Sequence, residues 1–477
     1  MLNKNDNFLA ITYTIAALFP CNLYKVRSPM QNTKKLALAV LVQTALISTA
    51  FASEQSESKG FVEDAEGSVL FRTGYLSRDK TNYRDNTTGL EKQVDDTSSA
   101  AQTAMVKIES GYTKGIVGFG VGIIGDASFK LGDNDNAGNG MIPQHPDGSA
   151  YDHWARGGGI VKARISNTEV RYGTQVLDLP VLASNTARLV PEYFEGVLAT
   201  SREINGLELT AGKFTKNQYS DQIKSDGNEL DRAVVWGAKY KFNDALNASY
   251  FGTDIKDRLD RHYVNANYKQ ALANNSSLTY DFSGYHTKWD TKADGSAYTY
   301  SHTTSDLTDL SNNIWAISGT YNTGNHNVMM AYQQNTGNTG YDYGLGKGVG
   351  DGHQTIYLPN SYLSDFIGND EKSVQLQYTY DFAGLNVPGL SWTTAYVYGW
   401  DIDVADLSNR SQLIVDNATE REFFNQVKYT VQSGFAKDAS LRLRHSYYRA
   451  SDEYQAGNYI GDTNEWRIWL DIPVKFF

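Results

Sequence analysis

The 477-residue sequence contains a single cysteine, nine prolines and, beyond its first 52 residues, no run of 18 apolar residues. The lone Cys21 cannot form an intramolecular disulfide or a cysteine-ligated zinc site, and the lack of a long apolar run excludes a helical transmembrane segment. A formal net charge of −11 excludes nucleic acid as a partner, because a phosphate backbone is bound by a basic surface. An aromatic content of 12% excludes a disordered chain.

A secretory signal peptide is predicted over residues 30–52. It has two lysines near its start, an apolar stretch and the small-residue cleavage site Ala50-Phe51-Ala52. We interpret residues 1–29 as a mis-called N-terminal extension; the alternative is a long leader that includes them, and N-terminal sequencing of the precursor would decide. Cleavage would remove the cysteine and leave residues 53–477 with a net charge of −15.

The remaining chain alternates between apolar and polar residues with a period of two. Residues 466–476 place six apolar side chains on one face, and Leu441 and Leu443 alternate with Arg442 and Arg444. This is the pattern of a β-strand with one apolar side. A soluble sandwich shows the same pattern, but the signal peptide, the 32 tyrosines and strands of about ten residues favour an outer-membrane barrel, whose apolar side chains face lipid.

Turn chemistry predicts the number of strands. Short hairpin-type connections rich in Gly, Asn and Asp occur at residues 113–115, 166–168, 205–206, 243–244, 274–275, 324–325, 384–389 and 433–436. Longer polar stretches lie at residues 80–98, 132–154, 176–191, 291–310, 335–369 and 404–418. Eight short turns, with both termini at the same end, predict an all-β fold, an 18-stranded antiparallel transmembrane β-barrel. Its long loops would face outward and its short turns the periplasm.

Motifs for catalysis or cofactor binding fail in their context. Residues 120–125 match the dinucleotide fingerprint G-x-G-x-x-G, but no helix follows and the alternation fits a strand whose inner face is small. Residues 133–138 imitate a calcium loop, yet Ala137 and Gln144 replace oxygen ligands that the loop requires. No G-x-S-x-G occurs. We predict no catalytic residue, no cofactor and no metal site.

An outer-membrane barrel without a catalytic site can be a channel, and two alternatives to that function stay open at this point. An outer-membrane barrel hydrolase would cleave a generic ester or peptide and would lose that activity with one serine change. A structural or adhesin barrel would give no conductance in a planar bilayer. A single-channel recording with solute titration separates both from a channel.

Basic residues recur at strand positions that alternate with the apolar, lipid-facing ones, and their side chains are therefore expected to face the barrel lumen. They are Arg72, Lys107, Lys162, Arg164, Arg171, Arg202, Lys239, Arg442, Arg444 and Arg467. One interpretation is charge balance within the wall, because acidic residues share that parity: Glu109, Glu169, Asp381, Glu465 and Asp471. The other is a basic track that binds carboxylates in a water-filled pore. Parity alone leaves both interpretations open.

Several segments resemble the OprD family of substrate-specific outer-membrane porins. The most specific block comprises residues 162–166 (KARIS), 179–182 (LPVL), 188–191 (RLVP), 194–196 (FEG) and 201–212 (SREINGLELTAG). Further similar segments are residues 61–64 (FVED), 378–399, 441–444 (LRLR) and 464–467 (NEWR). The resemblance covers nearly all of residues 53–477.

The resemblance implies a monomeric barrel in the outer membrane of a Gram-negative bacterium, admitting small carboxylate-bearing solutes by passive, substrate-specific diffusion. Amino acids, aromatic acids, sugar acids and carbapenems all stay open as substrates. The implied basic ladder comprises Lys162, Arg164, Arg171, Arg202, Arg442, Arg444 and Arg467. Arg72 and Lys239 join it by parity, and Arg188 would lie at a constriction formed by an inward-folded loop, residues 177–191.

Residues 335–369 are a second candidate for lining the mouth of the channel. The expected partners are outer-membrane lipid, the carboxylate solutes and the barrel-insertion machinery, which reads a terminal aromatic residue in phase with the last lipid-facing set. Here that phase runs through Phe476 and leaves the terminal Phe477 one residue out, unless a bulge near Pro473 resets it. Nucleic acid and cofactors are not expected.

Overall fold

The computed structural model describes residues 53–85, 88–132, 138–299, 301–345, 355–455 and 460–477, all within one unit of the chain, residues 44–477. The predicted extension and signal peptide, residues 1–52, and most of the calcium-like loop, residues 133–137, lie outside the described residues. No helix in the described part of the chain is long and apolar enough to cross a membrane.

Eighteen antiparallel strands form one closed sheet. They are β1 (Glu66–Lys80), β4 (Thr97–Glu109), β5 (Val117–Lys130), β6 (His153–Ile165), β7 (Thr168–Gln175), β8 (Tyr193–Ile204), β9 (Leu207–Gln218), β10 (Ala233–Lys241), β11 (Leu246–Ile255), β12 (Leu259–Ala271), β13 (Ser277–Trp289), β14 (Ser311–Thr323), β15 (His326–Gly337), β16 (Lys372–Asp381), β17 (Leu390–Ala405), β18 (Leu413–Thr430), β19 (Ser440–Ala450) and β20 (Thr463–Lys475). The predicted 18-stranded barrel is confirmed.

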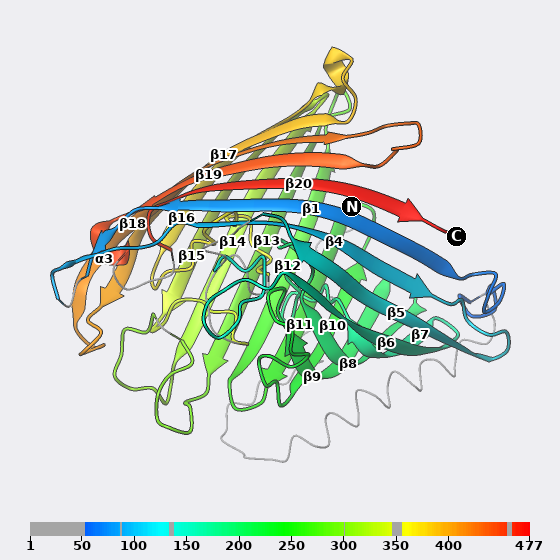
Figure 1. Ribbon diagram of the computed structural model, residues 1–477, viewed down its shortest axis with the longest axis horizontal. Helices are drawn as coiled ribbons and strands as arrows, with labels where there is room; N and C mark the ends of the chain where they lie inside the picture. Colours follow the sequence, from blue (N-terminus) through cyan, green and yellow to red (C-terminus); the bar gives the residue numbers. More distant parts are fainter. Residues whose placement is uncertain (1–52, 86–87, 133–137, 300, 346–354, 456–459) are drawn as a thin grey trace, which may run out of the picture. The chain divides into compact units, whose positions relative to one another are not determined.

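Neighbouring strands in the barrel follow one another along the chain, and the barrel closes where β1 pairs with both β20 and β4. Figure 1 shows the closure, with β20 running beside β1. The connections hold four short elements: β2 (Tyr83–Arg84), which pairs with β3 (Glu91–Lys92), the 3₁₀ helix η1 (Phe382–Leu385) and the helix α3 (Asp452–Gln455).

All eight predicted short turns lie between paired strands. Two of them show why their residues were informative: Gly206 has φ +77°, and Asn274 and Asn275 have φ +56° and +55°. Gly and Asn adopt this left-handed conformation at little cost, which tight hairpins require. The eight turns define one end of the barrel, called the short-turn end below.

The long connections at the other end differ from prediction in three places. The expected loop at residues 404–418 shrinks to 406–412, because β17 and β18 continue through the polar stretch with register shifts between them. The connection at residues 219–232 and the one that includes the described residues 451–455 and 460–462 were not predicted. Both are rich in polar residues but carry no composition that distinguishes a loop from a polar strand end.

The tyrosines lie in two kinds of environment. One set lies on the exposed outer face with the other apolar side chains, as predicted for a lipid-facing surface: Tyr75, Tyr172, Tyr240, Tyr250, Tyr268, Tyr280, Tyr321, Tyr396, Tyr398, Tyr429 and Tyr447. A second set, which the prediction missed, is buried: Tyr112, Tyr193, Tyr219, Tyr263, Tyr285, Tyr341, Tyr343, Tyr448 and Tyr454. A phenol suits the interior because its ring packs while its hydroxyl finds a polar partner.

An apolar core fills one side of the lumen. Leu179 and Leu182 pack there with Tyr341 and Leu358, which come from the loop after β15, against the inner face of strands that include β13. The Tyr285 hydroxyl donates to the Pro180 carbonyl at 3.1 Å. The loop at residues 177–191 therefore folds inward, as predicted, and its packed apolar half positions its basic end in the lumen.

Candidate functional site in the barrel lumen

A row of glycines on the inner face of β5 lets its two neighbouring strands interact across it. A Cβ atom at Gly120 would lie 2.7 Å from Lys162 Cε, and one at Gly122 would lie 2.8 Å from Glu109 Cγ. With no side chains in the way, Lys162 Nζ on β6 donates to Glu109 Oε2 on β4 at 2.9 Å. The fingerprint at residues 120–125 is therefore strand, as predicted, and its glycines make room for an ion pair.

Glu109 gathers the basic residues of this part of the wall. Arg171 Nη2 donates to Glu109 Oε1 at 2.6 Å, and Lys107 Nζ lies 3.2 Å from the same atom. Arg171 also contacts Glu169 at 3.4 Å. We call Glu109, Lys107, Lys162, Arg171 and Glu169 the Glu109 cluster. Its three cations contact the wall carboxylates of Glu109 and Glu169, as the charge-balance interpretation predicts.

Tyr112, in the turn after β4, adds an aromatic surface beside this cluster. The Arg164 guanidinium lies 4.1 Å and Lys162 Nζ 4.8 Å from its ring centroid, distances at which a cation is attracted to the ring face. Its hydroxyl donates to Glu169. Burial and then the Glu169 carboxylate raise the pKa of Tyr112, so the phenol stays protonated and keeps donating.

A second group of arginines surrounds the tip of the inward loop. Arg72 Nε donates to Asp471 Oδ1 at 2.7 Å, and Arg72 Nη1 donates to the Arg188 carbonyl at 3.1 Å. Arg467 Nη1 donates to the Ala187 carbonyl at 3.3 Å. Two wall arginines thus hold the backbone of the loop, and this arrangement, which we call the constriction cluster, places Arg188 in the lumen.

Two further residues complete the constriction cluster. Glu465 accepts from Arg78 Nε at 2.8 Å and from Arg467 Nε. Arg188 itself is only 1% exposed. Burial, and then the charge of Arg78, lower the pKa of Arg188 to about 9, so the guanidinium remains charged at neutral pH. The cluster holds four arginines against two carboxylates and carries a net positive charge.

Arg442 and Arg444, which we call the β19 arginines, differ from the basic residues of both clusters in their lack of a carboxylate partner among the described residues. Leu441 and Leu443, which alternate with them, are exposed on the outer face, so both arginines point into the lumen. Arg444 lies directly across from Arg467 and has its guanidinium 4.9 Å from the Phe424 ring. Within the part of the chain that the structure describes, neither makes an ion pair, and buried Nε atoms of both have no hydrogen-bond partner.

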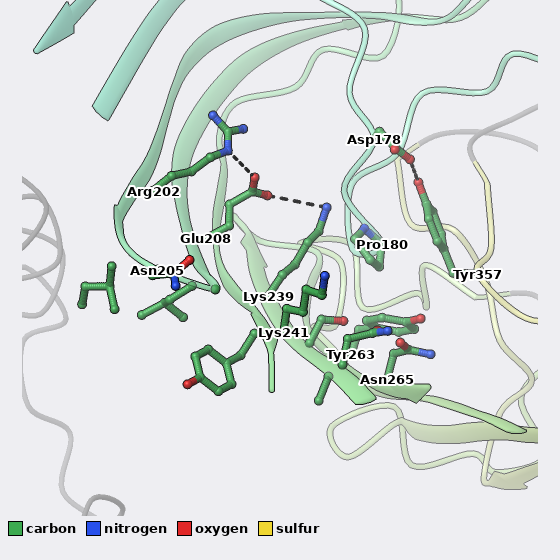
Figure 2. Close-up of a pocket in the computed structure, with 17 residues that line it drawn as sticks. Asp178, Pro180, Arg202, Asn205, Glu208, Lys239, Lys241, Tyr263, Asn265 and Tyr357 are labelled. Carbon is green, nitrogen blue, oxygen red and sulfur yellow. Dashed lines mark hydrogen bonds and ion pairs between the residues drawn. The ribbon is translucent and has the colours of Figure 1, made fainter. Parts of the chain in front are cut away.

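Arg202 and Lys239 line a cavity of about 670 Å³ near the short-turn end. Figure 2 shows both beside Glu208, with Arg202 Nε at 2.9 Å and Lys239 Nζ at 3.7 Å from its carboxylate oxygens. The inward loops form the other side of the cavity, where the Tyr357 hydroxyl donates to Asp178. Burial and then Asp178 raise the pKa of Tyr357.

The predicted site residues therefore fall into three places: the wall beside Glu109, the constriction with the adjoining β19 arginines, and the cavity. Asp381, which the charge-balance interpretation offered as a partner for the basic residues, has a different role. Its carboxylate instead accepts from the Ala383 amide at 2.9 Å and caps η1, because a carboxylate at the start of a helical turn is satisfied locally.

Several lumen residues escaped prediction, among them Arg78 and Arg261. Arg78 shares the parity of Arg72 on β1 and could have been found by extending that pattern. Arg261 could not, because its neighbours on the same face, Leu259 and Tyr263, are apolar and buried against the loop core. Arg261 Nη1 donates to the Tyr343 carbonyl at 3.2 Å and holds that loop. No group of metal-ligating side chains occurs among the described residues.

Comparisons with known proteins agree with this geometry. Residues 59–476 match the model of a family described as outer membrane porin, OprD family. Porin D of Pseudomonas aeruginosa is 35% identical over 459 residues, covering 92% of this chain and 98% of that protein.

Two solved structures extend the comparison. The crystal structure of Acinetobacter baumannii OccAB1 has 66% identity and a TM-score of 0.82, covering 89% of this chain and 100% of that one. The structure of P. aeruginosa OpdK with vanillate has 26% identity and a TM-score of 0.72, covering 87% of this chain and 100% of that one.

Proposed function

The chain belongs to the OprD family of outer-membrane porins, and on that premise we propose that it is a passive channel for small carboxylate-bearing solutes, which move along the basic residues of the lumen. The observation that carries the proposal is the pair of β19 arginines. Both guanidinium groups face the lumen, and no carboxylate of the described wall pairs with either.

A guanidinium group without a wall partner is available to a solute. Arginine presents donors in a fixed fork that matches the two oxygens of a carboxylate, and it remains charged while hydrated. The neighbouring arginines of the constriction cluster already have carboxylate or carbonyl partners. They raise the local positive potential. Arg442 and Arg444 are half-buried. Their guanidinium nitrogens other than the buried Arg442 Nε, Arg444 Nε and Arg444 Nη2 are the donors at which a solute carboxylate would replace water.

The relative crystallised with vanillate supports the choice of solute class, because vanillate is an aromatic carboxylate. Aromatic acids are therefore the first group to test, followed by amino acids, sugar acids and carbapenems. Transport needs no catalytic step: weak sequential sites let a solute enter and leave, and its concentration gradient sets the direction.

The test compares Arg442→Ala/Arg444→Ala with a matched control, Arg421→Ala. Arg421 lies on the adjacent strand β18, is exposed, and shares the outer face with Phe423, so its removal changes the net charge without changing the lumen. We expect the double variant to lose most of its anion selectivity in planar bilayers and to take up benzoate several-fold more slowly in vesicles.

The control variant should match the wild type in both assays. A second pair, Arg164→Ala with Arg444→Ala, tests whether the wall farther along the lumen also contributes. Equal benzoate and amino-acid uptake by wild type and both lumen variants would contradict the proposal. A wild-type protein with no conductance would contradict any channel function.

A further inference from the structure

The segment at residues 53–65 lies against the short-turn end of the barrel and is anchored there by Gln55. The Gln55 side chain is 4% exposed, and its Nε2 donates to the carbonyls of Thr113 at 3.0 Å and Gly115 at 3.1 Å. Its backbone amide donates to the Ser166 carbonyl at 3.1 Å. A Cβ atom at Gly118 would lie 2.4 Å from Gln55 Oε1, so the glycine makes room for this anchor.

A second anchor follows a few residues later. Ser58 Oγ donates to the Tyr112 carbonyl at 3.0 Å, and the Gly111 amide donates to the Phe61 carbonyl at 2.8 Å. Both anchors contact the turn between β4 and β5. The segment is thus held by defined hydrogen bonds on the lumen side of the wall, beside the basic residues of the Glu109 cluster.

The anchored segment presents one carboxylate to two members of the predicted ladder. Glu54 Oε2 lies 3.7 Å from Arg164 Nη1, and Glu54 Oε1 lies 3.8 Å from Arg202 Nη1. The Glu54 amide donates to Asn167 Oδ1 at 2.8 Å, which fixes the start of the side chain. One glutamate therefore bridges an arginine of the wall and an arginine of the 670 Å³ cavity. Arg202 also donates from Nε to Glu208 at 2.9 Å, and Arg164 donates from Nε to Gln55 Oε1 at 3.2 Å, so only the Nη1 atoms of the two arginines face Glu54.

The two contacts of Glu54 are looser than those of Glu109. Their distances exceed those of a direct charge-assisted hydrogen bond. The side chains of Glu54 and Arg202 are 43% and 48% exposed, whereas that of Arg164 is 15% exposed, so the contact with Arg202 is the more exposed of the two. Exposed ion pairs of this kind are weak. Glu109, by contrast, receives donors at 2.6 and 2.9 Å with its side chain 10% exposed. We therefore expect a solute carboxylate to displace Glu54 more readily than Glu109.

The geometry points to Glu54 as a tethered carboxylate that occupies the Arg164–Arg202 site and competes there with the carboxylate of the passing solute. This inference rests on the proposed function. A tethered competitor acts at a high effective concentration, so it takes the site as soon as a solute leaves. Glu54 would thereby weaken solute binding at the short-turn mouth and set the concentration at which transport saturates.

Glu54→Gln tests this inference, because the amide keeps the size of the side chain and leaves the Gln55 anchor intact. We expect the benzoate concentration for half-maximal block of single-channel current to fall about fivefold, the effect of losing one weak ion-pair competitor. The matched control is Glu57→Gln, which removes the same charge from an exposed side chain of the same segment.

The Glu57→Gln protein should bind benzoate as the wild type does. In an Arg164→Ala/Arg202→Ala background, Glu54→Gln should have no further effect, because its partners are gone. Equal shifts in the Glu54 and Glu57 variants, or a full shift in the double-alanine background, would overturn the inference. Heat-modifiable gel mobility checks that each variant folds as a barrel.

The outcome is separable from that of the proposed function. If the β19 variants lose carboxylate flux while Glu54→Gln behaves like Glu57→Gln, only the role of Glu54 is wrong. If the β19 variants transport benzoate as the wild type does, the proposed function is wrong whatever Glu54 does.

Discussion

The Glu109 cluster and the β19 arginines both place positively charged side chains on the inner surface of the barrel, but only those of the Glu109 cluster have carboxylate partners in the wall. Lys162 and Arg171 both donate to one wall carboxylate within 2.9 Å, whereas Arg442 and Arg444 pair with no carboxylate among the described residues. The difference shows that lumen-facing charge is not by itself a binding site. What distinguishes the two regions is whether the wall already supplies the counter-charge.

The comparison also reconciles the two interpretations that parity left open. Charge balance holds beside β5, where Glu109 and Glu169 lie among the cations, and a track of available cations fits β19. A wall carboxylate stabilises the barrel because unpaired cations crowded together repel one another. An arginine without a wall carboxylate gives up that stabilisation, and under the proposed function it serves the solute instead.

The largest expected effect comes from removing the acid of the paired region. Glu109→Gln leaves Lys162 and Arg171 close together without their carboxylate, and their side chains are only 7% and 24% exposed. We expect the free energy of unfolding to fall by about 3 kcal/mol, the lower end of the range for breaking a buried pair. Urea unfolding in detergent micelles measures it.

The same variant should become more anion-selective, because two cations lose their wall partner. If Glu109→Gln unfolds like the wild type and keeps its selectivity, the two regions do not differ in the way described.

The converse change gives the unpaired region an acid. Gln426 on β18 lies directly across from Arg444, and side chains on such cross-strand pairs approach within reach of each other. Gln426→Glu should therefore neutralise Arg444 and lower benzoate flux about fivefold, as expected for about 1 kcal/mol of competing ion pair. Vesicle uptake is the measurement, with Gln426→Asn as the uncharged control.

The control should transport as the wild type does. Unchanged flux in Gln426→Glu would show that Arg444 does not serve as a solute site.

The smallest effect is expected where the pair is exposed. Glu208 contacts Arg202 and Lys239 at the cavity, but the side chains of both cations are about half exposed, at 48% and 50%. Glu208→Gln should change the free energy of unfolding by less than about 1 kcal/mol, measured as for Glu109→Gln. A loss as large as that of Glu109→Gln would show that burial does not set the value of these pairs.

Much of the fold was predictable because its signals are local. Each short turn is specified by its own Gly, Asn or Asp residues, and strand parity is specified by alternation, so strand number and the inward direction of Arg444 followed from the sequence. The sequence did not predict which side chains pair with one another in the lumen. Glu109 and Lys162 lie on strands that are not neighbours, and they meet only because Gly120 and Gly122 leave the space between them empty.

The rule that apolar residues face lipid also failed on one side of the barrel. Tyr263 and Trp289 point inward there, because the lumen is filled by the apolar loop core. Sequence alone could identify the apolar run at residues 179–182 as a buried loop segment, but not which strands it packs against. The position of Glu54 could not be predicted either, because it depends on the hydrogen bonds of Gln55 to turns at residues 113–115 and 166.

The glycine row of β5 has a consequence for how this protein can vary. Every replacement of a glycine adds at least a Cβ atom, and at residues 118, 120 and 122 that atom would meet Gln55, Lys162 and Glu109 within 2.8 Å. Loss of transport can therefore arise at three uncharged positions while every lysine, arginine and glutamate of the lumen is preserved. A survey of natural variants that tracked only the charged residues would count such a channel as intact.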